Sequence, residues 1–168
     1  DKRLLQRKGI KNIFEYEWWE GFKADNLELT FTPVQHWSKR GLFDRNKSLW
    51  GGWFFKFEDY SIFHAGDTGY SNDFKETKSR LGSPKYAFIP IGAYDPEWFM
   101  AESHVNPEDA VQIMLDLGAE NSFGMHWATV KLTDEDTLEP KERLDKAISN
   151  INMDNFIAPS PGSVINLD

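Results

Sequence analysis

Apolar and polar residues alternate strictly over residues 26–32, where leucine or phenylalanine occupies every second position. This period of two predicts a β-strand with one buried face. Aromatic-rich runs over residues 49–57 and 60–64 predict further strands, and Gly51-Gly52 in the first run indicates a bulge or a close approach of two backbones. Predicted strands therefore crowd the first part of the chain.

The clearest helix signal lies later in the sequence. Asn106 is a good N-cap residue, Pro107 suits the first helical position, and Gly118 is a typical stop after an apolar stretch. Because strands dominate early and alternate with helices late, the pattern favours a single α/β (α+β) domain. The other predicted elements are a helix capped by Ser71 or Asn72 that runs to Arg80, a buried strand over residues 86–89, a strand over 121–126, a helix over 140–148 and an extended segment over 156–165.

Composition narrows the classes of function. The 168 residues, 40% of them hydrophobic, suffice for one core. A formal net charge of -8 argues against a protein that binds nucleic acid through broad phosphate contacts. Cysteine is absent, so a zinc-type site must use His, Asp and Glu. No apolar run approaches the roughly 18 residues of a membrane span, so we expect no transmembrane segment. Because the sequence does not open on an initiator Met, we do not expect Asp1 to be the genetic start.

Three residues that suit a metal ion lie beside the ends of predicted strands. His36 follows the first strand, Asp67 follows the strand over residues 60–64, and His126 ends a later strand. Functional groups often gather at the carboxyl edge of a sheet, which makes a shared metal site a hypothesis. The alternative for Asp67 is a turn-capping residue, a common role beside Gly and Thr.

Five strings around these residues occur in one order: TPVQHWSKR from Thr32, FHAGDTGY from Phe63, IPIGAYDPEWFM from Ile89, HVNPEDA from His104 and MHWAT from Met125. Together they resemble the N-acyl-phosphatidylethanolamine-hydrolysing phospholipase D family and its bacterial relatives in the metallo-β-lactamase superfamily. The resemblance covers about residues 8–145. It implies a metallo-β-lactamase αββα sandwich made of two similar halves, of which residues 1–168 form the carboxyl-terminal, second half.

The resemblance also implies the roles of the site residues. His36 would bind one divalent ion, His126 the other, and Asp67 would bridge the two ions, which are expected to be zinc and to activate water for attack on a phosphodiester. His104 would assist the leaving group or stabilise charge on the phosphate. The alternative for His104 is that it only caps or packs against the helix that follows it.

Other conspicuous side chains have weaker functional signals. The aromatic loop over residues 92–100 predicts that Tyr94 and Trp98 line the substrate cleft, with closure of the core as the alternative. His64 is expected on the strand surface, pointing away from Asp67. The acidic residues Glu108, Asp109, Asp134, Glu135 and Asp136 are interpreted as ordinary solvated charge.

The His-x-His-x-Asp-His signature of the family is absent from this sequence, so each ion would have only two ligands here. We therefore expect the amino-terminal half as a separate segment, or a self-associated copy, to cover an apolar sheet face. The expected activity of the complete protein is hydrolysis of N-acyl-phosphatidylethanolamine or a related phospholipid, in the cytoplasm or at a membrane surface. The alternatives are a lactonase, a nucleotide phosphodiesterase, or a non-catalytic truncated partner module.

Overall fold

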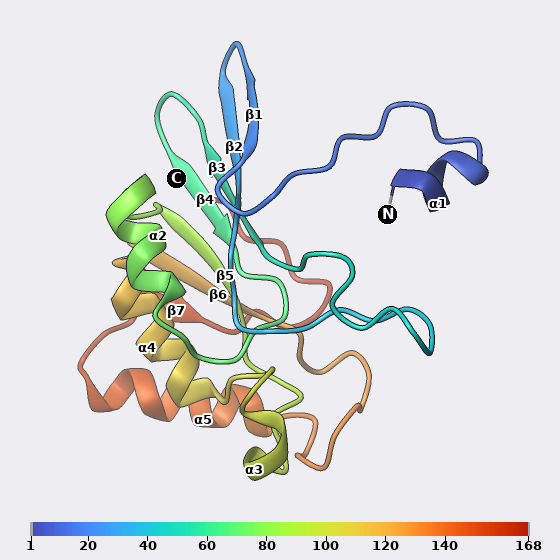
Figure 1. Ribbon diagram of the computed structural model, residues 1–168. Helices are drawn as coiled ribbons and strands as arrows, with labels where there is room; N and C mark the ends of the chain where they lie inside the picture. The colour runs from blue at the N-terminus through green and yellow to red at the C-terminus, as the bar shows by residue number, and fades with distance from the viewer. Residues whose placement is uncertain (1, 168) are drawn as a thin grey trace.

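Seven strands pair in sequence order to form one sheet, and three helices lie against one side of it (Figure 1). This computed structural model describes residues 2–167. Its strands are β1 (Gly21–Ala24), β2 (Leu27–Thr32), β3 (Gly52–Lys56), β4 (Ser61–His64), β5 (Tyr86–Pro90), β6 (Asn121–Met125) and β7 (Phe156–Ile157), and its helices are α1 (Lys2–Arg7), α2 (Asp73–Leu81), α3 (Glu97–Met100), α4 (Pro107–Leu117) and α5 (Glu139–Asn150).

The sheet changes character at β4. Strands β1 to β4 pair antiparallel, whereas β4 to β7 pair parallel. Each parallel pair needs a crossover, and α2, α4 and α5 supply the three in turn. Since β2 and β4 are both antiparallel to β3, they run the same way as β5 and β6. The carboxyl ends of β2, β4, β5 and β6 therefore share one edge of the sheet.

The early strands form where the alternating and aromatic patterns predict them. In β2, Leu29 pairs with Phe55 and Phe31 pairs with Trp53 of β3. The predicted close approach at Gly51 is confirmed: a Cβ there would lie 2.4 Å from the carbonyl oxygen of Thr32. Only a residue without a side chain lets the chain enter β3 this close to β2.

The cap signals of α4 are also confirmed. The Asn106 side chain accepts a hydrogen bond from the backbone N–H of Asp109 at 2.8 Å. Gly118 ends the helix in the left-handed conformation, with φ of 63°. Asn72 precedes α2 without a side-chain cap bond, and α5 extends one residue earlier and two later than predicted.

Two departures from the predicted elements have local causes. Strand β1 was not predicted because only one large apolar residue, Phe22, occurs in it, and all four residues are exposed. The extended segment predicted over residues 156–165 was too long, since β7 ends at Ile157. Pro159, Pro161 and Gly162 follow, and proline has no N–H with which to continue a ladder.

The two faces of the sheet differ. One face packs Phe63, Ala87 and Ile89 against the buried side chains of the helices, including Phe74 and Leu144. On the other face, rings from successive strands form an aromatic layer made of Phe31, Trp53, Tyr86, Phe88 and Phe123. Helices α2, α4 and α5 all lie on the first face (Figure 1), so the aromatic layer forms a face without helices, called the open face, although its Phe31, Tyr86 and Phe123 side chains are themselves buried. None of the helices within residues 2–167 is both long and apolar enough to cross a bilayer.

Candidate metal centre

His36 enters the site on the segment that follows β2. An isolated bridge between Gln35 and Gly69 joins this segment to the turn after Asp67. The Nδ1 atom of His36 lies 2.8 Å from the carbonyl oxygen of Trp37, which can only accept, so Nδ1 carries the proton. The other ring nitrogen, Nε2, is buried and finds no hydrogen-bond partner among residues 2–167. An imidazole held in this tautomer offers a free lone pair, as a metal ligand must.

Asp67 and His126 meet at the same edge. Asp67 lies three residues past β4, and His126 directly follows β6. The His126 Nε2 atom is 3.6 Å from Asp67 Oδ1. This distance is too long for a good hydrogen bond, but it would let both atoms contact one bound ion. The Nδ1 atom of His126 is buried and lacks a hydrogen-bond partner within the described chain.

His104 lies between the other two site histidines. Its ring centroid is 5.3 Å from that of His36 and 5.6 Å from that of His126. Burial lowers the pKa of His104 and the neighbouring histidines lower it further, while Asp67 opposes the shift. The structure thus brings together all four predicted metal and catalytic residues and favours a neutral His104.

The donors fit part of a metal centre. Imidazole nitrogen and carboxylate oxygen are ordinary zinc ligands, and His36 Nε2 is a buried polar atom that a bound ion would satisfy. Within residues 2–167, however, no three histidine or acidic side chains converge as a full ligand group. The count of two ligands for each ion stays a prediction.

Thr68 positions the segments that carry these ligands. Its buried hydroxyl accepts from the backbone N–H of Gln35 at 3.1 Å and donates to the carbonyl of Gly69 at 2.7 Å. The Thr68 carbonyl accepts from the N–H of Val105, the neighbour of His104, at 2.9 Å. One residue therefore ties the segments of His36, Asp67 and His104 together.

The His126 backbone is held in an uncommon conformation. Its φ is 60°, in the left-handed region that a residue with a side chain adopts at a cost of roughly 1 kcal/mol. Gly92 lies against it, and a Cβ at that position would be 2.4 Å from the His126 carbonyl oxygen. The loop after β5 and the end of β6 thus fix the direction of the His126 side chain.

The matching family model describes a β-lactamase superfamily domain and covers residues 2–127. The chain belongs to the metallo-β-lactamase superfamily. It is 43% identical to the mitochondrial N-acyl-phosphatidylethanolamine-hydrolyzing phospholipase D of Saccharomyces cerevisiae over 86% of this chain and 32% of that protein. It is 36% identical to N-acyl-phosphatidylethanolamine-hydrolyzing phospholipase D 1 of Caenorhabditis elegans over 97% of this chain and 50% of that protein.

A solved structure supports the same fold. Igni18, a metallo hydrolase of Ignicoccus hospitalis, matches with a TM-score of 0.72 at 23% identity, over 99% of this chain and 65% of that one. The predicted fold class is therefore confirmed. This metallo-β-lactamase chain spans about a third to a half of the length of the two curated relatives.

Two acidic residues of this metallo-β-lactamase chain are more than solvated charge, which corrects the interpretation from sequence. Glu108 forms a bidentate pair with Arg143, with the shortest bond at 2.7 Å. Glu135 accepts from the backbone N–H groups of Ala93 at 2.6 Å and Asp95 at 3.2 Å.

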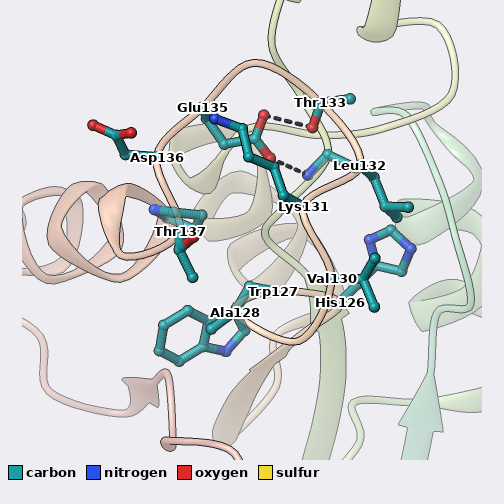
Figure 2. Close-up of a pocket in the computed structure, with 12 residues that line it drawn as sticks. His126, Trp127, Ala128, Val130, Lys131, Leu132, Thr133, Glu135, Asp136 and Thr137 are labelled. Atoms are coloured by element: carbon teal, nitrogen blue, oxygen red, sulfur yellow. Dashed lines mark hydrogen bonds between the residues drawn. The ribbon is translucent and has the colours of Figure 1, made fainter.

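Glu135 joins the loop after His126 to the loop after β5. Figure 2 shows its carboxylate within the 127–138 loop, bonded to the Thr133 hydroxyl at 2.6 Å, with His126 lining the same pocket. Burial alone would raise the pKa of Glu135, but the bonds from Thr133, Ala93 and Asp95 lower it below its usual range. Sequence reasoning missed Thr68 and Glu135, although Thr68 stands within the FHAGDTGY string.

The two predicted substrate-binding residues occupy different environments. Tyr94 is 1% exposed, its hydroxyl donates to Glu139 at 3.0 Å, and the Arg143 guanidinium lies 4.7 Å from its ring. That position corresponds to the core-closing alternative. Trp98 is 87% exposed on α3, so substrate contact stays a prediction for it. His64 is exposed, and its Nδ1 accepts from the Gly66 N–H at 3.1 Å.

Proposed function

We propose that the complete protein is a metal-dependent phosphodiesterase of the phospholipase D type, which hydrolyses N-acyl-phosphatidylethanolamine or a related phospholipid. The observation that carries the proposal is the convergence of His36, Asp67, His104 and His126 at one sheet edge, with a ring nitrogen of each histidine buried and without a partner within residues 2–167. The substrate class follows from the similarity to the two N-acyl-phosphatidylethanolamine-hydrolyzing phospholipases D.

Three residues would hold two divalent ions, which we expect to be zinc. His36 would bind through Nε2 to one ion, His126 to the other, and the two oxygens of Asp67 would serve both. Bound ions would act as Lewis acids toward the phosphate, and they would lower the pKa of bound water toward neutrality. The ligands missing from this chain would come from the amino-terminal half of the domain.

His104 would act on the reacting phosphate through a ring nitrogen. As a neutral imidazole it carries one proton, which it can share with a phosphate oxygen or with the departing alcohol oxygen. Because the ring is held between His36 and His126, it would lie beside a phosphate bound at this edge of the sheet. Thr68 and Glu135 would position these groups without touching substrate.

Metal content and hydrolysis of the full-length protein test this proposal. We expect about two zinc ions per protein and release of phosphatidic acid from N-acyl-phosphatidylethanolamine. His36→Ala, Asp67→Asn and His126→Ala should each lower kcat/KM roughly 100-fold or more and reduce bound metal. His64→Ala is the matched control and should retain both.

A substrate panel separates the other functions of this fold. Hydrolysis of lactones or cyclic nucleotides in preference to the phospholipid would overturn the substrate assignment. Absence of bound metal in the full-length protein, together with absence of hydrolysis, would instead indicate a non-catalytic partner module.

A further inference from the structure

Three segments beside the metal centre expose large apolar side chains. Leu42 and Phe43 are 83% and 87% exposed, Trp98 and Phe99 are 87% and 67% exposed, and Val130 and Leu132 are 68% and 64% exposed. Clusters of large exposed apolar residues mark contact surfaces in soluble proteins. We call these six side chains the apolar rim.

Each segment of the apolar rim is attached to a site histidine. The 37–48 loop starts at His36, the 127–138 loop starts at His126, and α3 ends four residues before His104. In Figure 1 the three segments lie toward the same end of the molecule, beside the carboxyl ends of the strands. The apolar rim therefore lies on two loops and on α3, each next to a residue of the candidate metal centre.

Internal hydrogen bonds fix the conformation of the 37–48 loop. The Asp44 carboxylate accepts from the backbone N–H groups of Gly41 at 2.6 Å and Arg40 at 3.1 Å. At the base of the loop, the Asn46 N–H donates to the Ser38 carbonyl at 2.7 Å. These bonds keep Leu42 and Phe43 exposed to solvent, although burying either side chain against the protein would be favourable.

Charge identifies the kind of surface that this loop fits. Four basic residues and one acidic residue give the 37–48 loop a net charge of +3, whereas the whole chain carries -8. The basic residues are Lys39, Arg40, Arg45 and Lys47. Apolar tips flanked by basic residues are typical of proteins that rest on a lipid surface, where the tips enter the acyl boundary and the cations meet phosphate groups.

We propose that the apolar rim docks on the surface of a phospholipid bilayer, with the 37–48 loop as its main contact, and so turns the metal centre toward the lipid. The substrate side of this proposal rests on the proposed phospholipase function, whereas the docking itself does not. Such docking would let the enzyme draw substrate from a bilayer.

Vesicle sedimentation of the full-length protein tests the docking. We compare the parent with Leu42→Asp/Phe43→Asp on vesicles of phosphatidylcholine containing phosphatidylglycerol. The double substitution should lower the partition coefficient roughly 30-fold or more, because two buried apolar side chains are lost. Val164→Asp is the control, since Val164 is 90% exposed but lies in the carboxyl-terminal segment, and it should bind as the parent does.

A second pair of variants isolates the charge contribution. Lys39→Glu/Arg40→Glu should reduce binding most on vesicles with phosphatidylglycerol and least on pure phosphatidylcholine, and added salt should diminish the difference. Parent-like binding by both loop variants would overturn the proposal. So would a parent that binds no vesicle, which would indicate a protein contact at the apolar rim.

Hydrolysis of a short-chain, water-soluble phosphodiester separates the two proposals. Leu42→Asp/Phe43→Asp should hydrolyse this substrate at the parental rate, which also shows that the variant is folded, while hydrolysis in vesicles falls with binding. If the phosphodiesterase proposal fails, hydrolysis of both substrates is absent and vesicle binding persists. If the docking proposal fails, the loop variants hydrolyse vesicle lipid as well as the parent does.

Discussion

Tyr94 and Trp98 lie four residues apart, yet one ring is buried and the other is exposed. The Tyr94 ring is enclosed and its hydroxyl is bonded to Glu139, whereas the Trp98 ring faces solvent beside Phe99. Burial raises the pKa of Tyr94, and the hydrogen bond to Glu139 raises it further, so the phenol stays neutral. A buried neutral phenol stabilises the fold, while an exposed indole is available to a ligand.

This contrast predicts separable effects of two substitutions. Tyr94→Phe should lower the free energy of unfolding by about 1 kcal/mol, because one hydrogen bond is lost, and leave KM unchanged. Trp98→Ala should leave stability within about 0.5 kcal/mol and raise KM for a soluble phosphodiester roughly threefold to tenfold. Denaturant titration and steady-state kinetics measure both. A raised KM in Tyr94→Phe would contradict the assignment of Tyr94 to the core.

At the scale of elements, the sequence predicts correctly those helices and strands that are determined by neighbouring residues. The caps of α4 and the alternation of β2 depend on neighbouring residues and were predicted correctly. The hairpin from β1 to β2 was missed because its two-residue turn, Asp25-Asn26, lacks the glycine that usually marks such a turn.

The candidate site was predictable in its ligands but not in its supports. His36 and His126 are 90 positions apart in the sequence, so spacing alone could not pair them, and the family motifs were needed to do so. Thr68 and Glu135 act through contacts 33 and 42 residues away in the sequence. Nothing in the local pattern distinguishes Glu135 from the solvated Asp136 beside it.

The Glu135 contacts predict a pH dependence of stability. The hydrogen bonds hold the folded-state pKa of Glu135 below that of an ordinary glutamate, so the charged carboxylate stabilises the fold above the ordinary pKa, and this contribution is lost as the pH falls through the folded pKa. Glu135→Gln should lower the free energy of unfolding at pH 7 by about 1 kcal/mol, because one amide oxygen cannot serve both the Ala93 and Asp95 N–H groups.

Unfolding of parent and variant at several pH values checks this prediction. The difference between Glu135→Gln and the parent should be constant near neutrality and shrink below about pH 4.5, the unfolded carboxyl value. Asp136→Asn removes the same charge from the next, exposed position and should change stability little. A difference that grows on acidification would contradict the assigned role.

The whole molecule has one well-covered sheet face and one open face. No helix within residues 2–167 packs on the layer of aromatic rings across β2, β3, β5 and β6, in which Phe31, Tyr86 and Phe123 are buried and Trp53 and Phe88 are partly exposed. Tyr16 packs edge-on against Trp53 at 5.9 Å at one margin, and Ile165 and Leu167 of the carboxyl-terminal segment line a pocket together with Tyr86 and Phe123. In the two curated relatives, at least half of the sequence lies outside the aligned region. We propose that the amino-terminal half of the domain packs on the open face.

Expression of residues 1–168 alone tests this proposal. Because Trp53 and Phe88 of the aromatic layer then stay partly exposed, the chain should elute from gel filtration as a self-associated species and bind an apolar dye, whereas the full-length protein should do neither. Phe88→Ser/Phe123→Ser should reduce self-association of the isolated chain, since it replaces two stacked rings of the layer. Leu42→Asp/Phe43→Asp, which changes the apolar rim instead, should leave self-association unaltered. A compact monomer of residues 1–168 without dye binding would show that the open face needs no partner, and the missing metal ligands would then have to come from elsewhere.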